Sequence, residues 1–119
     1  MKLNWVTIRV SNLEQSVAFY TETLGMEVAS RFGGGGRQIV MLGKADEAKV
    51  ELICETGNKV ESPGSGVSIG LESEDLDVLV DTLKAKGCPV SGPVSPNPHV
   101  RFYFVKDPDG YTVQLVEQS

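Results

Sequence analysis

The sequence has few of the residues on which metal centres and disulfide frameworks depend. Its 119 residues include one histidine, His99, and two cysteines, Cys54 and Cys88. The cysteines lie far apart without the close spacing of a zinc-binding pair, which indicates reduced thiols. A chain of this length buries enough apolar surface to fold as one domain without a disulfide or a structural metal.

Basic residues are also scarce, and they are scattered along the chain. Sixteen acidic residues outnumber eleven lysines and arginines, which gives a net charge of -5. Because nucleic-acid binding needs a basic face, we expect no nucleic-acid partner. No apolar run is long enough to span a membrane, and no charged segment leads into an apolar one near residue 1. We therefore expect no membrane association and a cytoplasmic protein.

The most informative feature that is present is an internal repeat. Residues 5–13 align without a gap on residues 68–76, and each copy ends in a similar apolar-rich strand segment, 50–55 in the first and 113–118 in the second. Self-similarity of this kind indicates the fold directly. The alignment pairs positions across the copies: Trp5 with Ser68, and Glu51 with Gln114.

The first copy, residues 1–56, predicts a strand, a helix and three further strands. Alternation over residues 3–10 indicates the first strand. Ser11 and Glu14 form a capping-box pattern that opens a helix, and Gly25 ends it. The other elements are expected as strands at 27–32, 38–42 and 49–55, with the four glycines 33–36 as a flexible hairpin tip.

The second copy, residues 67–119, repeats this order after a linker at 57–66 that is rich in glycine and proline. Residues 67–72 predict a strand and residues 76–86 a helix that Gly87 ends. A short strand near Val90 is followed by a loop that Pro93, Pro96 and Pro98 interrupt. Two strands close the copy, at 100–106 and 112–117, joined by a turn at 107–110.

Two βαβββ modules in one domain, residues 1–119, predict an α+β fold with a mostly antiparallel sheet and the helices on one side. On the first strand, the apolar residues Val6, Ile8 and Val10 should face the helix. The opposite face carries polar side chains in both modules: Trp5, Thr7 and Arg9, Glu51, Ser68 and Gln114. Such a face is too polar for a second core, so it is either a solvent face or the lining of a cavity.

Two segments resemble the vicinal oxygen chelate superfamily: LNWVTIRVSNLEQSVAFYTETLGMEV at the start and FYFVKDPDGYTVQLVE at the end. The superfamily includes glyoxalase I, fosfomycin-resistance enzymes, extradiol dioxygenases and bleomycin-resistance proteins. The resemblance covers essentially the whole chain. It implies a glyoxalase/bleomycin-resistance-like fold in which the sheets curl into a concave cleft, with the ligand on the face that alternation selects.

The resemblance also implies where a metal would bind. Metal-using members take ligands from four positions, which fall on Trp5, Glu51, Ser68 and Gln114. Only Glu51 is a good ligand, because an indole has no free lone pair and hydroxyl or amide oxygens bind transition metals weakly. His99 lies off the pattern. Since a transition-metal centre normally needs three good protein ligands, we expect no metal and no other cofactor.

The candidate ligand-binding residues are Trp5, Thr7, Arg9, Glu51, Ser68, Phe102, Phe104 and Gln114. Trp5 is either an aromatic plate for a flat ligand or a core residue. Glu51 either lies in the cleft or is a solvated carboxylate, and Arg9 either pairs with it or meets an anionic group. The strand pattern leaves open whether the phenylalanines or Tyr103 and Val105 face the core, and the resemblance places the phenylalanines nearer the cleft.

Three residues or segments with chemical potential have plainer expectations. His99 should be exposed, since no orienting partner is evident for it. Cys54 should face the helix as an inert thiol. Glycines 33–36 are expected as a hairpin tip rather than as a mobile flap over a cleft.

Three functions fit these residues. The first is a protein that binds a planar or cationic small molecule without a metal, as the resistance proteins of the superfamily do. The second is an enzyme, a lyase, isomerase or dioxygenase that uses Glu51 as a base or an atypical metal site. The third is a scaffold without a ligand. We also expect a homodimer, in which the cleft closes within one chain or between two.

Overall fold

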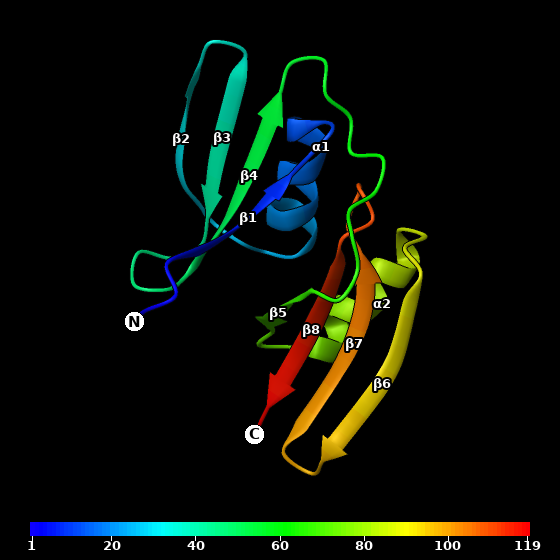
Figure 1. Ribbon diagram of the computed structural model, residues 1–119. Helices are drawn as coiled ribbons and strands as arrows, with labels where there is room; N and C mark the ends of the chain where they lie inside the picture. The colour runs from blue at the N-terminus through cyan, green and yellow to red at the C-terminus, as the bar shows by residue number, and fades with distance from the viewer. The chain divides into compact units, whose positions relative to one another are not determined.

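The computed structural model describes residues 1–119 and divides them into two compact units, Met1–Glu61 and Ser62–Ser119. Each unit contains one four-stranded sheet and one helical region between its first two strands in sequence (Figure 1). The order of elements in each unit is strand, helix, strand, strand, strand. The fold is therefore α+β and is built from two βαβββ modules.

The first unit holds four strands and two consecutive helical segments. These are β1 (Trp5–Arg9), α1 (Leu13–Ala18), the π-helical turn η1 (Phe19–Thr23), β2 (Val28–Gly34), β3 (Arg37–Leu42) and β4 (Lys49–Glu55). The strand order is β1-β4-β3-β2, with β1 parallel to β4 and the other neighbours antiparallel.

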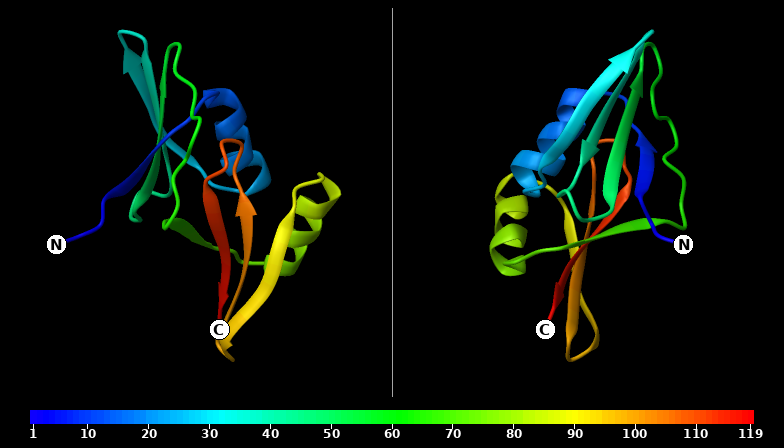
Figure 2. Two further views of the ribbon diagram at one scale, coloured as in Figure 1. Left: turned by 45° about the vertical axis from the view of Figure 1, so that its right-hand side comes forward. Right: turned by 90° about the vertical axis from the view of Figure 1, so that its left-hand side faces the viewer.

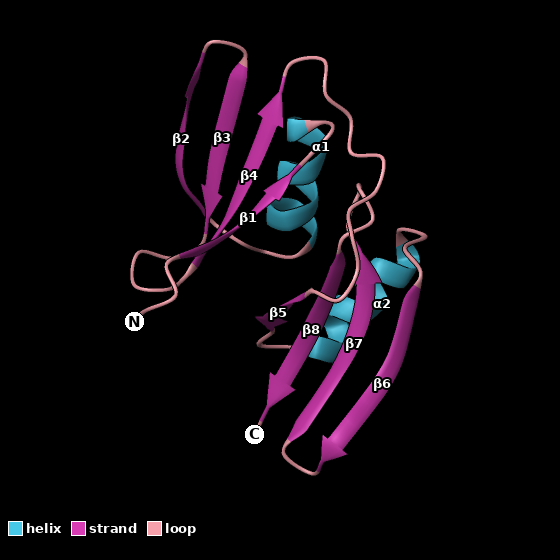
Figure 3. Ribbon diagram, viewed as in Figure 1, coloured by secondary structure: helices cyan, strands magenta, loops and turns pink.

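The second unit repeats this topology. Its elements are β5 (Ser68–Glu72), α2 (Leu76–Ala85), β6 (Val90–Asn97), β7 (Val100–Lys106) and β8 (Thr112–Gln118). The strand order is β5-β8-β7-β6, again with one parallel pair, β5 and β8 (Figure 3). Strand β5 begins 63 residues after β1, and β8 begins 63 residues after β4 (68 − 5 and 112 − 49). The repeat expected from the sequence is thus a repeat of structure.

Each helix covers one face of its own sheet, and the other face is open (Figures 1 and 2). Because side chains alternate between the faces of a strand, every second residue is buried under the helix. The core of the first unit consists of Ile8, Val10, Val40, Leu42, Val50 and Leu52, with Leu13, Val17, Phe19 and Tyr20 from the helical segments. The core of the second unit consists of Val105, Val113 and Leu115, with Leu76, Val80 and Leu83 from α2.

The start of α1 differs from the expected capping box. The N-cap is Asn12, whose Oδ1 accepts a hydrogen bond from the backbone N–H of Gln15 at 3.0 Å. The hydroxyl of Ser11 instead accepts from the backbone N–H of Val60 at 2.7 Å. The capping-box interpretation was wrong because an asparagine, an equally good cap, follows the serine.

The proline-rich segment of the second unit is a strand, not the expected loop. Pro93 and Pro96 both lie within β6, whose pairing with β7 shifts register between Ser91 and Val94 and again between Val94 and Asn97. Strand β6 is the last strand of its sheet, where half of the backbone N–H groups need no partner. Proline is tolerated there and at bulges, so the segment forms a strand despite its composition.

The glycine run is only partly a hairpin tip. Gly33 and Gly34 extend β2, and the turn consists of Gly35 and Gly36, whose φ angles are +62° and +85°. At Gly33 a Cβ atom would lie 2.4 Å from the carbonyl oxygen of Arg37, so no larger residue fits there without a shift of the backbone.

Neither helix of the protein combines the length and the apolar character that crossing a membrane demands.

Candidate functional site

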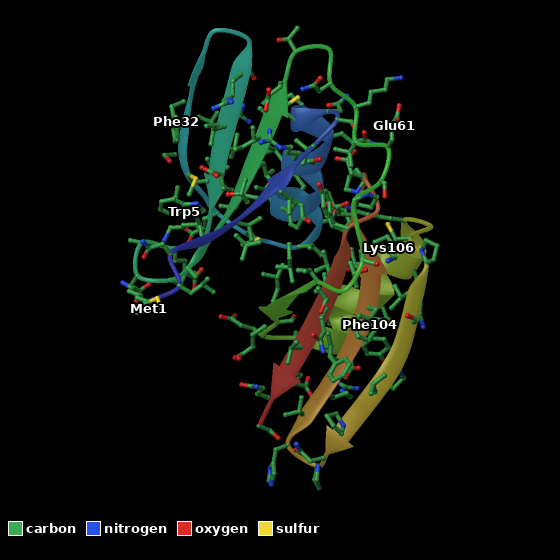
Figure 4. The ribbon with its side chains drawn as sticks, in the orientation of Figure 1. Met1, Trp5, Phe32, Glu61, Phe104 and Lys106 are labelled. Carbon is green, nitrogen blue, oxygen red and sulfur yellow. The ribbon has the colours of Figure 1, made fainter.

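The open face of the first unit carries the first four candidate residues. Trp5, Thr7 and Arg9 alternate with the helix-facing residues of β1, and the register with β4 puts Glu51 directly beside Thr7. Trp5 is 52% exposed, which excludes the core interpretation for this residue (Figure 4). The full open face also includes Lys49, Ile53 and Glu55 on β4, Arg37, Ile39 and Met41 on β3, and Ser30 and Phe32 on β2.

Glu51 is held in place by a neighbouring hydroxyl. The Oγ1 of Thr7 donates a hydrogen bond to Glu51 Oε1 at 2.6 Å. The carboxylate is half-buried, with the side chain of Met41 next to it in the register of β3. A carboxylate that accepts one hydrogen bond keeps free lone pairs, so Glu51 can accept further hydrogen bonds or lie beside a cation.

Charged side chains form a cluster on the same face, around Glu55 at the other end of β4. The guanidinium of Arg9 forms an ion pair with Glu55, and Arg37 Nη2 lies 3.9 Å from the same carboxylate oxygen. Two guanidinium groups therefore share one carboxylate. Sequence patterning places Arg9 and Glu55 on this face, but it does not predict that they pair, because pairing depends on the register of β1 against β4.

The open face of the second unit carries the other four candidate residues. Ser68 begins β5, and Gln114 lies beside Gly70 on one side and beside Phe104 on the other. The rings of Phe102 and Phe104 meet edge to face, with centroids 5.4 Å apart and an interplanar angle of 81°. Phe102 and Phe104 are both half-buried. Val105, which lies on the opposite face of β7, is buried. The alternative that the phenylalanines form the core is therefore wrong.

The lone histidine and the helix-side cysteine have ordinary surroundings. His99 is exposed in the β6–β7 turn, and its backbone N–H donates to Asn97 Oδ1 at 2.8 Å. The thiol of Cys54 is half-buried on the helix side and donates to the carbonyl oxygen of Ser11 at 3.8 Å. Neither residue lies on an open face.

A hollow of about 460 Å³ lies in the first unit. It is bordered by the start of α1 and the β2–β3 hairpin, and its lining includes Leu13, Arg31, Gln38, Cys54 and Thr56. None of the eight candidate residues contributes to it. Arg31, one of two arginines in its lining, forms an ion pair with Glu14 at 2.9 Å, which holds the pKa of that carboxyl below its usual value.

A second arginine makes an equivalent contact in the other unit. Arg101 on β7 donates to Asp77 at 2.9 Å and to Glu117 at 3.1 Å. The hydrogen bond from Arg101 lowers the pKa of Asp77, and both carboxylates raise the pKa of the guanidinium. Glu14 and Asp77 both lie in the first turn of a helix, so each helix is tied to its sheet by an arginine.

The sequence comparison assigns the family. A sequence model described as Glyoxalase/Bleomycin resistance protein/Dioxygenase superfamily matches residues 2–115. The chain belongs to this superfamily. A putative lactoylglutathione lyase of Brassica oleracea var. gemmifera is 33% identical over 123 residues, which cover 96% of this chain and 43% of that protein. The chain thus spans less than half the length of this plant relative.

Two solved structures have the same fold as this chain. The trypanothione-dependent glyoxalase I of Leishmania major matches with a TM-score of 0.85 at 27% identity, covering 98% of this chain and 86% of that one. TnmS3, an antibiotic binding protein from Streptomyces sp. CB03234, matches with a TM-score of 0.74 at 25% identity, covering 100% and 97%. Glyoxalases and a binding protein are therefore both similar to this chain.

The residues at the four positions that the superfamily resemblance implies as metal ligands do not fit a transition metal. Trp5 offers no lone pair, Ser68 and Gln114 offer weak oxygen ligands, and Glu51 remains as the one good ligand. Within each unit, no group of three or more histidine, cysteine, aspartate or glutamate side chains is placed to hold a metal ion. We therefore derive no metal-dependent step for these residues.

Gly70 also lies on the open face of the second unit, as alternation along the strand predicts, but it is not among the eight candidate ligand-binding residues. It lies in the middle of β5, opposite Gln114. Its signal was available, because a glycine inside an alternating strand is unusual and often marks a close approach of another group to the backbone.

Proposed function

We propose that this superfamily member binds a small planar or cationic molecule without a metal. One observation carries the proposal: the four ligand positions hold Trp5, Glu51, Ser68 and Gln114, a set that suits stacking and hydrogen bonding better than metal coordination. The similarity to TnmS3 supports it, since that protein binds an antibiotic.

The open face of the first unit offers complementary groups for such a molecule. Trp5 presents an exposed indole. Its partner on β4 is Lys49, and Glu51 lies two residues further along the same strand. An indole face attracts cations as well as flat rings, and a carboxylate nearby strengthens the attraction to a cation. The Arg9–Glu55–Arg37 cluster offers a second, oppositely charged handle on the same face.

A titration with three probes tests this proposal. Proflavine is planar and cationic, 2-naphthol is planar and neutral, and tetrapropylammonium is cationic but not planar. We expect saturable binding of proflavine at one site per chain, weaker binding of 2-naphthol, and the weakest binding of tetrapropylammonium. Trp5→Ala and Glu51→Gln should each weaken proflavine binding about tenfold, while Glu22→Gln, an exposed glutamate in η1, should not.

Metal content must be measured on the same material. Protein purified without a histidine tag should contain less than one transition metal per chain by elemental analysis, and proflavine affinity should be the same before and after treatment with EDTA. One metal per chain that survives dialysis, together with loss of binding in EDTA, would overturn the proposal.

A second candidate function is favoured by a specific observation, the 33% identity to a putative lactoylglutathione lyase. On this proposal the chain is an enzyme, and Glu51, oriented by Thr7, acts as its base. An assay for lactoylglutathione lyase activity separates the two proposals. Activity that Glu51→Gln abolishes in metal-free protein would favour the enzyme. The homodimer and the cytoplasmic location expected from the sequence stay predictions.

A further inference from the structure

Gly70 lies in the interior of β5, and nothing in the protein requires a glycine there. It is not among the glycines with positive φ angles, so its backbone suits any residue. A Cβ atom built on it would meet only Gln114 Oε1, at 3.9 Å, which is an ordinary van der Waals distance. Because glycine inside a strand lowers stability, an unforced glycine often marks a place where a ligand approaches the backbone.

The side chain beside Gly70 has unused hydrogen-bonding groups. Gln114 is the Cα partner of Gly70, and its carboxamide forms no hydrogen bond within the protein. At the equivalent place in the first unit, the hydroxyl of Thr7 bonds Glu51. In the second unit, Gly70 has no side chain that could bond the Gln114 carboxamide. The carboxamide therefore keeps both its N–H donors and its carbonyl acceptor available.

An aromatic wall completes this surface. Phe104 is the β7 partner of Gln114, and its ring is fixed against Phe102 by an edge-to-face contact. Both rings are half-buried, so each presents part of its surface to the open face. A flat molecule gains by stacking on such a ring while its edge meets a polar group.

From this geometry we infer that Gly70, Gln114 and Phe104 form a subsite for the edge of a planar ligand that carries a hydrogen-bond donor next to an acceptor, as in a lactam or a cyclic amide. The ligand ring lies over the bare backbone of Gly70 and against Phe104. The Gln114 carboxamide donates to the ligand's carbonyl and accepts from its N–H, the paired contact that glutamine makes with an adenine edge. The inference rests on the proposed small-molecule binding and names the class of ligand.

Two matched probes test the inference directly. 2-Quinolone has an N–H next to a carbonyl, and 2-methoxyquinoline has the same rings without the N–H donor. In ¹⁵N-labelled protein, 2-quinolone should shift the side-chain NH₂ resonances of Gln114, which are assigned by their absence in Gln114→Leu. 2-Methoxyquinoline should bind about tenfold more weakly, because it leaves one half of the amide unpaired.

Variants at Gly70 give a result that a purely structural role would not produce. Gly70→Ala and Gly70→Thr should raise the melting temperature, since both remove the flexibility of glycine and threonine favours strands. Both should weaken 2-quinolone binding tenfold or more by filling the space above the backbone, and Gln114→Leu should do the same by removing the amide. Glu72→Gln, on the same strand and face but outside the subsite, should change neither quantity.

The outcomes separate this inference from the proposed function. If 2-quinolone binds Gly70→Ala and Gln114→Leu as tightly as the unchanged protein, the subsite is wrong and the proposed binding function stands. If proflavine binds but 2-quinolone does not, the inference alone is overturned. If neither compound binds, both fail.

Discussion

Thr7 and Glu51 are Cα partners on neighbouring strands, and the hydroxyl of Thr7 donates a hydrogen bond of 2.6 Å to the carboxylate. The two residues are 44 positions apart along the chain, so this contact forms only when the parallel strands β1 and β4 pair. It fixes the orientation of the one good anionic group at the four ligand positions. Its importance is for position more than for stability, because both side chains reach solvent.

Replacing Thr7 by valine removes the donor and keeps the shape. We expect the free energy of unfolding to fall by less than about 1 kcal/mol, because water replaces the hydroxyl at an exposed hydrogen bond. Proflavine binding should weaken, since Glu51 is then free to rotate. Urea denaturation and a proflavine titration measure the two effects. Thr7→Ser is the control that keeps the donor, and a loss of several kcal/mol in Thr7→Val would show that the contact is a structural one.

Trp5 should report on ligand binding by its fluorescence. It is the only tryptophan and is 52% exposed, so acrylamide should quench its emission efficiently in the free protein. A saturating non-fluorescent planar cation should protect it and lower the quenching constant. Emission that acrylamide does not reach in the free protein would contradict the exposure of Trp5. Quenching that stays the same with bound ligand would remove Trp5 from the ligand site.

The buried hydroxyl of Ser16 should lower the stability of the folded protein. Its side chain is completely buried in α1, and its hydroxyl oxygen has no hydrogen-bond partner. Ser16→Ala should raise the free energy of unfolding by about 1 kcal/mol, because an unpaired buried hydroxyl costs roughly that much and alanine favours the helix. Urea denaturation measures the change, with the exposed Ser30→Ala as control. A less stable Ser16→Ala protein would mean that a buried water bonds the hydroxyl.

The ion pair between Asp77 and Arg101 should make stability depend on pH at acidic values. The hydrogen bond from Arg101 lowers the pKa of Asp77 in the folded protein below its ordinary value of 3.8. The pair therefore stabilises the fold fully above that ordinary value, and the contribution is lost as pH falls through the lower folded pKa. Asp77→Asn should reduce the urea midpoint at pH 7 and leave it nearly unchanged at the lowest pH at which the protein is folded.

The control for this pH effect is Asp81→Asn, an exposed aspartate in the same helix. It should give a smaller change than Asp77→Asn at pH 7. An Asp77→Asn effect that is equally large in an Arg101→Met background would show that the helix end, rather than the arginine, is responsible.

We also predict that two copies of the chain associate. Phe32 is 55% exposed on β2, the edge strand of the first unit, and twofold dimers are the commonest oligomers of soluble proteins. Analytical ultracentrifugation over a range of micromolar concentrations should detect a dimer, which Phe32→Glu disrupts and Ser30→Glu does not. A monomer at every concentration would contradict the prediction.

Much of the fold was predictable from the sequence because its signals are local. Alternation in β1 separated Ile8 from Thr7 by face, and the internal repeat predicted the same order of elements in both units. A short strand was expected near Val90, but the proline-containing rest of β6 was not, because prolines are acceptable only at an edge, and the edge position of a strand depends on the whole sheet. The same limit applies to Arg9. Alternation predicts the face on which Arg9 lies, but its ion pair with Glu55 depends on the register of β1 against β4, which alternation does not give.

The prolines of β6 also limit where a strand from another molecule can pair with these sheets. Strand β6 contains Pro93 and Pro96, which have no N–H donor, and its register is irregular, so its outer rim is a poor template for another strand. Strand β2, the corresponding rim of the other sheet, contains no proline, and all seven of its residues are exposed. Intermolecular strand addition, whether in an assembly or in aggregation during unfolding, is therefore confined at these two rims to β2.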